Sequence, residues 1–398
     1  MRCVRLILVF TLASVSQNAQ TSPDSALYPI EKNGKHGYID ASGRIVVRPR
    51  FDDAWRFSEG LAAVVVGDKW GFIDQTGRIV IAPRFFSAMP FKEGVACVGA
   101  FFEGGPINNR VGDYGYIDKT GGFLIAPQFS VAFDFSNGLA RISTDDYKHG
   151  YIDKAGKVVF WDKRLMEDFS DNRALFKTES NLPDSKTGYL DSVGREAISP
   201  TFDWGQSFSE GLACVSRNKK AGFIDTKGNV AIAFRFDSCR SFSEGLAAVM
   251  IDDKWGYIDK AGHLVIEPRF ADTNPFSDGV AVVRVLGQSE LPHQEQRYKS
   301  GSNIVSVMPG KFGVVDKNGR MILQPVFVQL GNFSKGLAWV NLGVDYVVHG
   351  KIDKRGYINK KGKFVWTSFR DSRSRTTTST GARDLSFTTF PKSLTRAR

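Results

Sequence analysis

The sequence is poor in the residue types that build catalytic and metal centres. Its 398 residues include only 4 cysteines and 5 histidines. The histidines are scattered, and no two of them stand at the spacing of metal ligands. No Cys-x-x-Cys pair, Gly-x-Ser-x-Gly turn or phosphate-binding glycine loop occurs. We therefore expect a protein that is not an enzyme and that holds no cofactor and no metal ion.

Long apolar runs are also missing. No segment stays apolar for 18 residues, so we expect no transmembrane helix. Arg2 and Arg5 precede a short apolar stretch that ends at Val15, and small residues follow it, which is the pattern of a signal peptide. We expect residues 1–16 to be removed, with cleavage after Ala19 as a second option. The mature protein would then be secreted or periplasmic.

The few cysteines do not form a disulfide framework. Removal of the signal peptide leaves Cys97, Cys214 and Cys239, which is an odd number. Cys97 and Cys214 hold the same place in two repeats that are three units apart, so we expect them not to bond. Cys214 and Cys239 fall in adjacent repeats. We favour three free thiols and leave a Cys214–Cys239 disulfide open.

Excess positive charge is confined to the ends of the chain. The net charge is +11. Arg2 and Arg5 supply two of these charges and the tail 367–398 supplies five, which leaves +4 for residues 20–366. A mixed-charge surface of this kind does not indicate nucleic-acid binding. The tail is rich in Ser, Thr and Arg and has no period, so we interpret it as disordered.

The chain has 40 glycines and 31 phenylalanines, and both follow a repeat. A Gly-aromatic-Ile-Asp pattern, strict in some copies and looser in others, starts at Gly37, Gly71, Gly115, Gly150, Gly188, Gly222, Gly256, Gly313 and Gly356. The shortest step between these glycines is 34 residues, and the longer steps contain insertions. A constant period of this size is the signature of a repeat architecture.

Each unit contains the signals of three short strands. In the unit that starts at Gly71, the first strand ends at Asp74, and Asp74 and Gly77 form a hairpin turn. The apolar run 79–81 predicts a second strand that is buried on both faces and ended by Pro83. A third strand, 95–98, contains an alanine that recurs in the other units, which indicates close packing by a neighbouring unit.

These features predict an all-β protein. Residues 17–36 would be a linker, residues 37–366 an array of about nine three-stranded β-hairpin repeats, and residues 367–398 the basic tail. We favour an open superhelical stack of repeats, because propeller blades usually need four strands and more residues. A closed, propeller-like toroid is the alternative.

The pattern resembles the WG-repeat (KWG) family. Lys69-Trp70-Gly71-Phe72-Ile73-Asp74 and Lys254-Trp255-Gly256-Tyr257-Ile258-Asp259 match its signature, and the resemblance covers about residues 37–366. The units that start at Gly150 and Gly356 depart from it, because both lack the proline. The resemblance implies a binding or scaffold role and carries over no single activity.

Three recurring residue types could form sites. The aspartate that stands three residues after eight of the nine glycines caps a turn or, less simply, binds calcium. The acid of the second turn, as in Glu93, is replaced by a lysine in one copy and therefore does not indicate a general acid. The aromatic residues before the glycine either pack between repeats or form an exposed ladder for sugars; they are Trp70, Tyr114, Trp255 and Phe312.

The insertions indicate where a partner binds. The distance from the first glycine to the third-strand alanine is nearly constant, so the extra residues fall after strand three. Segments 99–114, 285–311 and 341–355 would therefore emerge on one face and bind the partner. Aromatic and Arg side chains are enriched at interfaces, and the candidates are Phe101, Phe102, Arg297, Tyr298 and Tyr346. The sequence thus predicts an exported scaffold that binds a protein. A glycan-binding module is the alternative, and a hydrolase is the least favoured function.

Overall fold

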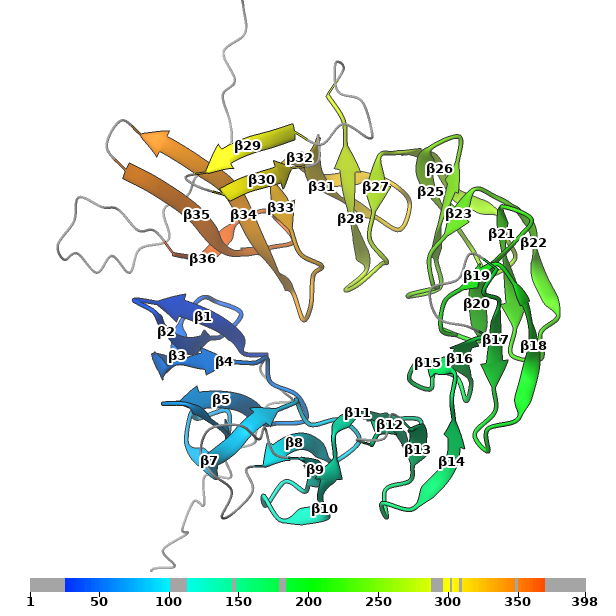
Figure 1. Ribbon diagram of the computed structural model, residues 1–398. Coiled ribbons are helices and arrows are strands. Elements are labelled where there is room, and N and C mark those ends of the chain that lie inside the picture. The colour runs from blue at the N-terminus through cyan, green and yellow to red at the C-terminus, as the bar shows by residue number, and fades with distance from the viewer. Residues whose placement is uncertain are drawn as a thin grey trace, which may run out of the picture.

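The computed structural model describes residues 26–100, 113–144, 148–178, 184–287, 296–300, 303–307, 310–347 and 350–368. Within these residues every regular element is a β-strand. The strands form small antiparallel sheets that follow one another around a ring (Figure 1). The all-β repeat fold predicted from the sequence is therefore confirmed. We call the sheets blades and number them 1 to 9 along the chain.

Each blade has three main strands, and most blades add a two-residue strand on one edge. Blades 1 to 3 contain β1 (Tyr28–Lys32), β2 (Lys35–Ile39), β3 (Ile45–Phe51); β4 (Asp53–Ala54), β5 (Ala62–Val66), β6 (Lys69–Ile73), β7 (Ile79–Ala88); and β8 (Ala96–Ala100), β9 (Tyr114–Ile117), β10 (Phe123–Phe129). Strand β7 is long enough to end blade 2 and begin blade 3, so these two blades form one seven-stranded sheet.

The next blades repeat the same order. Blades 4 to 6 contain β11 (Val131–Ser136), β12 (Leu139–Ser143), β13 (His149–Ile152), β14 (Val158–Asp162); β15 (Leu165–Met166), β16 (Ala174–Lys177), β17 (Thr187–Leu190), β18 (Glu196–Phe202); and β19 (Trp204–Gly205), β20 (Leu212–Arg217), β21 (Lys220–Asp225), β22 (Val230–Phe236). In Figure 1 the short strand β15 lies toward the centre of the ring, and β18 and β22 lie on its outside.

The last three blades complete the ring. Blades 7 to 9 contain β23 (Ser238–Cys239), β24 (Ala247–Ile251), β25 (Lys254–Ile258), β26 (Leu264–Phe270); β27 (Asp272–Thr273), β28 (Val280–Val285), β31 (Lys311–Asp316), β32 (Met321–Phe327); and β33 (Gln329–Leu330), β34 (Leu337–Val347), β35 (Gly350–Asn359), β36 (Phe364–Ser368). A separate two-stranded sheet, β29 (Gln296–Ser300) and β30 (Asn303–Val307), is inserted in blade 8.

The blades do not coincide with the sequence units. A blade combines the third strand of one unit with the first and second strands of the next, as β5 pairs with β6 and β6 pairs with β7. Each sequence unit is therefore shared by two neighbouring blades. The array also starts earlier than expected, because residues 28–36 of the predicted linker form β1 and the start of β2. Tyr28 occupies the place of Ala62, one period upstream.

The second strand of each unit differs from its prediction in two ways. Pro83 does not end β7; the strand continues through it to Ala88. Phe72 faces Ile81 and Trp70 faces Phe85, so the one residue between them on β6 opposes three residues on β7, and the proline lies in this bulge. A proline is tolerated here because the strand lies at the outer edge of the blade, where an N–H is not needed for pairing.

Burial of this strand on both faces is also wrong. Ile79 and Val80 are 43% and 42% exposed, and only Ile81 is buried, at 3%. The same order of two exposed residues and one buried residue recurs in β3, β10, β22 and β26. The run is apolar but lies on the outer strand, so its first two residues have no neighbouring strand to cover them.

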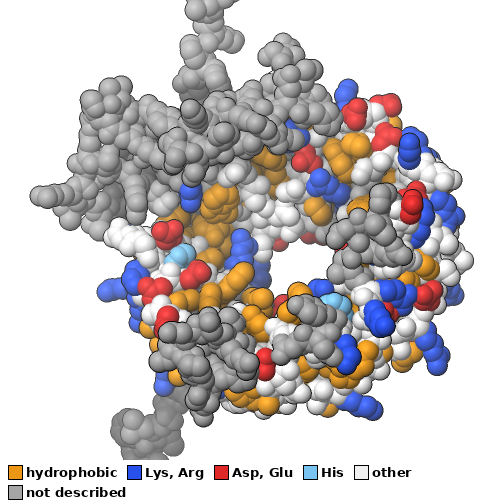
Figure 2. Space-filling model, viewed as in Figure 1, with side chains coloured by type: hydrophobic (Ala, Val, Ile, Leu, Met, Phe, Trp, Pro, Cys, Tyr) orange, Lys and Arg blue, Asp and Glu red, His pale blue; other side chains and the backbone are white. Residues whose placement is uncertain are grey.

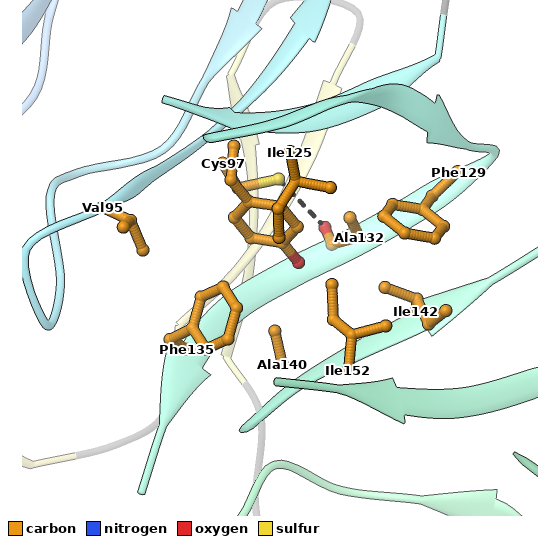
Figure 3. Close-up of a cluster of buried hydrophobic side chains, with 10 residues drawn as sticks. Val95, Cys97, Ile125, Phe129, Ala132, Phe135, Ala140, Ile142 and Ile152 are labelled. Atoms are coloured by element: carbon orange, nitrogen blue, oxygen red, sulfur yellow. Dashed lines mark hydrogen bonds between the residues drawn. The ribbon is translucent and has the colours of Figure 1, made fainter. Parts of the chain in front are cut away.

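The core lies between the blades rather than within one of them. Figure 3 shows the cluster between blades 3 and 4. Blade 3 contributes Cys97, Ile125 and Phe129, and blade 4 contributes Phe135 and Ala140, among other buried residues. The cluster between blades 1 and 2 likewise sets Tyr38 and Val47 against the recurring alanine Ala62. The alanine therefore allows the close packing that the sequence predicts.

The first and last blades are in contact, so the ring is closed. Tyr28 of β1 donates its hydroxyl hydrogen to the carbonyl oxygens of Ser334 (3.2 Å) and Lys335 (2.5 Å). Tyr357 of β35 donates to the carbonyl of Pro29 at 3.0 Å. An apolar cluster that includes Tyr28, Ile30 and Tyr357 seals this seam, and Figure 2 shows an opening through the centre. This is the toroid that the sequence left as the alternative to an open stack.

The cysteines differ from the favoured expectation. Cys214 of β20 and Cys239 of β23 form a disulfide with a Cα–Cα distance of 5.9 Å. The bond is formed because the cysteine after the recurring alanine of blade 6 faces the short strand of blade 7. Among the described residues, Cys97 is a free and buried cysteine.

Candidate functional site

The alternation of the turns gives the ring two different faces. In each blade the strands are antiparallel, so successive turns lie at opposite ends of the blade. We call the end that carries the connections equivalent to β5–β6 the insertion face. We call the end that carries the Asp-x-x-Gly turns, such as residues 74–77, the turn face. Lys119, in the turn 118–121, lies 3.3 Å from Glu59, which is in the second kind of turn, the one that precedes the recurring alanine. Both kinds of turn therefore share the turn face.

The long insertions lie in connections of the insertion face. Residues 285–311 contain the hairpin β29–β30, and residues 341–355 extend β34 and β35 into a longer ribbon. The described parts of these two segments are therefore mostly strand. Their bases are paired: Val285 faces Lys311 in blade 8. In the third insertion, the amide of Ala100 donates to the carbonyl of Asp113 at 3.0 Å.

Three of the five candidate partner-binding residues lie on described strands. Arg297 and Tyr298 lie on β29, where they face Ser306 and Val305 of β30. Tyr346 lies on β34 opposite Lys351. Phe101 and Phe102 lie outside the described residues. The hairpin of β29 and the ribbon of β34 belong to neighbouring blades.

Ring closure changes the relation between the insertions. In an open stack, the insertion of blade 3 and that of blade 9 would lie near opposite ends. Because blade 9 contacts blade 1, only blades 1 and 2 separate them. These two blades have short connections on the insertion face, at 32–35 and 66–69. The insertions of blades 8, 9 and 3 therefore flank the part of the insertion face where the connections are short.

The aromatic residues before the glycine pack between blades. Trp70, Tyr114, Trp255 and Phe312 are each half-buried against an inter-blade cluster. One of them has an exposed aromatic neighbour: the rings of Trp55 and Trp70 are 6.3 Å apart, and Trp55 is 45% exposed. Another is covered by a cation, because the Arg240 guanidinium lies 4.7 Å from the Trp255 ring. A continuous exposed ladder is therefore not formed by these four residues.

The recurring aspartates cap the turns of the turn face. Asp118 accepts hydrogen bonds from the amides of Thr120 (2.9 Å) and Gly122 (3.0 Å). The hydroxyl of Thr120 also donates to it, and this bond is the main reason why the pKa of Asp118 lies below its ordinary value. The same pattern occurs at Asp40, Asp74 and Asp225. These carboxylates are engaged by their own turns, as the simpler interpretation of the sequence predicts.

The acids of the second turn link neighbouring blades. Glu244 accepts a hydrogen bond from the amide of Gly279 at 2.9 Å and lies 3.3 Å from the Lys317 ammonium, both in the next blade. Glu244 itself has a positive φ of 53°. Equivalent bonds join Glu59 to Gly94 and Glu210 to Gly245. The position thus links neighbouring blades, which the sequence analysis did not predict.

The inner wall of the ring carries side chains that vary from blade to blade. The position two residues before each recurring Phe holds Trp55, Met89, Phe133, Glu167, Gln206, Arg240, Asn274 and Gly331. Several of these contact the next blade: Ser207 donates to Glu167 at 2.8 Å, and Asn274 donates to Asn332 at 2.7 Å. A variable position inside a constant repeat was visible in the sequence as a signal, although we did not use it.

Asp134 and Asp168 directly follow this variable position in two neighbouring blades. Burial raises the pKa of Asp134, with Lys92 opposing and Asp168 adding to the shift. Asp168 is itself held by the Arg141 guanidinium at 3.2 Å.

Within the described ranges, no group of three or more His, Cys, Asp or Glu residues could hold a metal ion. Nor does that part of the chain contain a helix able to cross a bilayer.

Comparison with solved structures places the fold among known ones. A structure titled as the crystal structure of the eukaryotic initiation factor matches with a TM-score of 0.55 and 10% identity, over 87% of this chain and 96% of that chain. BamB from Moraxella catarrhalis matches with a TM-score of 0.35 and 10% identity, over 66% and 92%. At these identities the first likeness concerns the fold alone. No curated protein matches the sequence.

The sequence also matches a family model described as WG containing repeat. The matched segments are residues 37–70, 70–99, 114–147, 188–220, 222–255, 255–288 and 312–343. Together they cover more than half of the chain. They include both Lys-Trp-Gly segments and the turn acids that join the blades. The chain therefore belongs to the WG-repeat family.

Proposed function

We propose that this chain is an exported, non-catalytic scaffold that binds a protein partner through its insertion face. The observation that carries the proposal is the placement of the long insertions. All three fall in the same kind of connection, and two of them form paired strands, β29–β30 and β34–β35. A constant framework with variable insertions on one face is typical of binding proteins.

Export is proposed from the N-terminus and supported by the disulfide. Arg2, Arg5 and the apolar stretch to Val15 have the order of a signal peptide. The Cys214–Cys239 bond joins two blades, and such structural disulfides persist in oxidising compartments. We expect N-terminal sequencing of the exported protein to begin at Gln17 or Gln20. An exported protein that retains Met1 would contradict the proposal.

The binding face is tested by substitution and by trimming. Replacing Phe101, Phe102, Arg297, Tyr298 and Tyr346 with alanine or serine should weaken capture of the partner from the compartment to which the protein is exported. The thermal midpoint should change little if these positions contribute to binding rather than stability. Shortening segments 99–114, 285–311 and 341–355 to the length of the β5–β6 turn should abolish capture and leave a folded ring. Unchanged capture by the trimmed protein would place the binding face elsewhere.

A glycan is the second candidate ligand, and one observation favours it. Exposed Trp55 beside half-buried Trp70 forms an aromatic pair that could stack on a sugar ring. Oligosaccharides of the cell envelope should then change the tryptophan fluorescence, and Trp55→Ala should remove the change. The matched control is Trp204→Ala, because Trp204 is 38% exposed in a blade without this pair. Equal loss in both variants would contradict a site at Trp55.

A further inference from the structure

Exposed apolar pairs recur at one place around the ring. They are the first two residues of the outer strands, directly after the Asp-x-x-Gly turns. In blade 1 Ile45 and Val46 are 42% and 37% exposed, and in blade 3 Phe123 and Leu124 are 43% and 53% exposed. The full set of exposed members is Ile45, Val46, Ile79, Val80, Phe123, Leu124, Val230, Leu264 and Val265. The blades leave these side chains uncovered, because the next blade buries only the third residue of each outer strand, such as Val47.

A basic residue precedes most of these pairs. The first residue after the turn glycine is Arg44, Arg78, Lys157, Arg195, His263, Arg320 or Lys363 in seven blades. All seven are exposed. The side chain of Arg44 remains 79% exposed even though it bonds to Asp40 at 3.0 Å. Six of these blades thus present an arginine or lysine here and blade 7 presents a histidine, and in most of them the two residues beside it are apolar.

These groups lie at one end of the ring. The Asp-x-x-Gly turns that precede them all belong to the turn face, and each turn glycine rests on the neighbouring blade. A Cβ atom on Gly77 would meet Val47 of blade 1 at 2.8 Å, and one on Gly121 would meet Ile81 of blade 2 at 3.0 Å. The same contact closes the ring, because Gly43 of blade 1 lies against the backbone of Val365 in blade 9. The basic residues and apolar pairs therefore recur along one rim of the turn face, with interruptions in blades 3 and 6, where Gly122 and Asn229 replace the basic residue, and in blade 5, where Glu196 replaces the first apolar residue.

We propose that this rim docks on the surface of a bilayer that contains anionic phospholipids. Guanidinium and ammonium groups pair with lipid phosphates, and adjacent apolar side chains enter the boundary of the acyl region. The repetition favours a lipid surface over a folded protein. A bilayer presents the same chemistry to every blade, whereas a protein partner would meet each blade with a different surface. The docked ring would direct its insertion face away from the membrane.

Vesicle flotation tests the proposal with the full mature chain. The wild type should bind vesicles of phosphatidylcholine with phosphatidylglycerol, and it should bind vesicles of phosphatidylcholine alone much less. The rim variant combines Arg44→Gln, Arg78→Gln, Arg195→Gln and Arg320→Gln. Removing four cations near the surface should lower the partition coefficient by about tenfold or more. A second variant, Ile45→Thr with Ile79→Thr and Leu264→Thr, should also bind more weakly, while threonine preserves the strand preference.

The control variant removes the same charge from the opposite face. It combines Lys32→Gln, Lys219→Gln, Lys254→Gln and Lys311→Gln, all exposed residues of insertion-face connections. The control variant should bind vesicles as the wild type does. The rim variant and the control variant should both keep the wild-type thermal midpoint. No binding by the wild type would overturn the proposal. Equal loss in rim and control variants would show a general charge effect, and binding that survives in the rim variant would assign the contact to the basic tail; either result would also overturn it.

Discussion

The glycine of the Trp-Gly pair is required by a close approach of two strands. Gly71 has an ordinary φ, yet a Cβ atom there would lie 2.6 Å from the carbonyl oxygen of Ile81 and 2.7 Å from the nitrogen of Pro83. The backbone of the bulge around Pro83 therefore packs directly against Gly71 and leaves no room for a side chain there. Gly115 and Gly256 have equivalent backbone contacts. The glycine and the proline that recur in the sequence are thus two halves of one contact.

We expect Gly71→Ala to destabilise the ring by roughly 1–3 kcal/mol, the usual cost of overpacking. Backbone atoms cannot move aside as a flexible side chain can. The measurement is the midpoint of denaturant unfolding. The control is Gly122→Ala, where a Cβ atom would meet only side-chain oxygens at 3.6 Å. That variant should unfold at the wild-type midpoint or slightly above it, and equal loss in both would refute the close-approach argument.

The disulfide has an unfilled counterpart elsewhere in the ring. Cys97 stands in blade 3 where Cys214 stands in blade 6, and Ala132 stands in blade 4 where Cys239 stands in blade 7. The Cys97 sulfur faces the Ala132 carbonyl at 3.6 Å (Figure 3). Burial raises the pKa of the Cys97 thiol, so it is unreactive while its surroundings stay closed.

Thiol counting separates the two cysteine pairs. The unfolded mature protein should show one free thiol, that of Cys97, in place of the three that the sequence favoured. Ala132→Cys should form a second disulfide during oxidative folding, so that the count falls to zero and the thermal midpoint rises. A count of two in this variant would mean that the two positions are not equivalent.

At the scale of elements, the second turn balances backbone strain against a contact with the next blade. Glu244 and Gly245 have φ angles of 53° and 85°, a pair that suits Asn-Gly far better than Glu-Gly. The carboxylate compensates by accepting from Gly279 and pairing with Lys317. The chain itself offers a comparison, because Asn137 at the equivalent place accepts from the amide of Asn172 at 3.1 Å.

Two substitutions separate these effects. Glu244→Asn should leave stability within about 0.5 kcal/mol of the wild type, because asparagine suits the left-handed backbone and keeps an acceptor. Glu244→Ala loses the acceptor and keeps the strain, so it should be less stable than the asparagine variant by about 1 kcal/mol. Both are measured by urea unfolding. An alanine variant as stable as the asparagine variant would show that the bond between blades contributes nothing.

The strands were predictable because their signals are local, whereas their surroundings were not. Asp74, Gly77 and the apolar run that follows specify a hairpin within ten residues. A tandem repeat has no intrinsic starting point, so the sequence could not show that β5 shares a blade with β6 rather than with β3, which belongs to the same sequence unit as β5. The missing alternation in residues 79–81 fits a doubly buried strand and also an outer edge strand. Only the position of the strand in the blade decides between them.

At the scale of the molecule, closure depends on small angles between blades that add up around the ring, and no single repeat contains that sum. The sequence nevertheless favoured one face for the insertions, because the spacing from glycine to alanine is constant. The side chains of the inner wall and the outer rim were not singled out. Their chemistry becomes visible only when residues such as Arg44 and Arg320, far apart in the chain, lie on the same rim.

A closed ring should tolerate new chain ends, and a circular permutant tests closure directly. Ser368 would be joined to Ala26 by a Gly-Ser linker of about ten residues, which spans about 17 Å on average. The new ends would lie between Asp252 and Asp253, a tight turn on the insertion face whose residues have φ angles of 49° and 59°. In the closed ring the linker crosses only the seam where Tyr357 bonds to Pro29, and blade 7 closes by pairing β24 from one end with β25 from the other. The permutant should therefore show the strand content of the parent by circular dichroism and unfold in one transition.

The matched control has the same new ends but no linker, so it consists of two separate fragments. It should retain its blades but depend on the seam contacts alone to hold its halves together, and should unfold at a lower temperature. In an open stack the short linker could not span the array, so a permutant that failed to fold while the control folded would contradict closure.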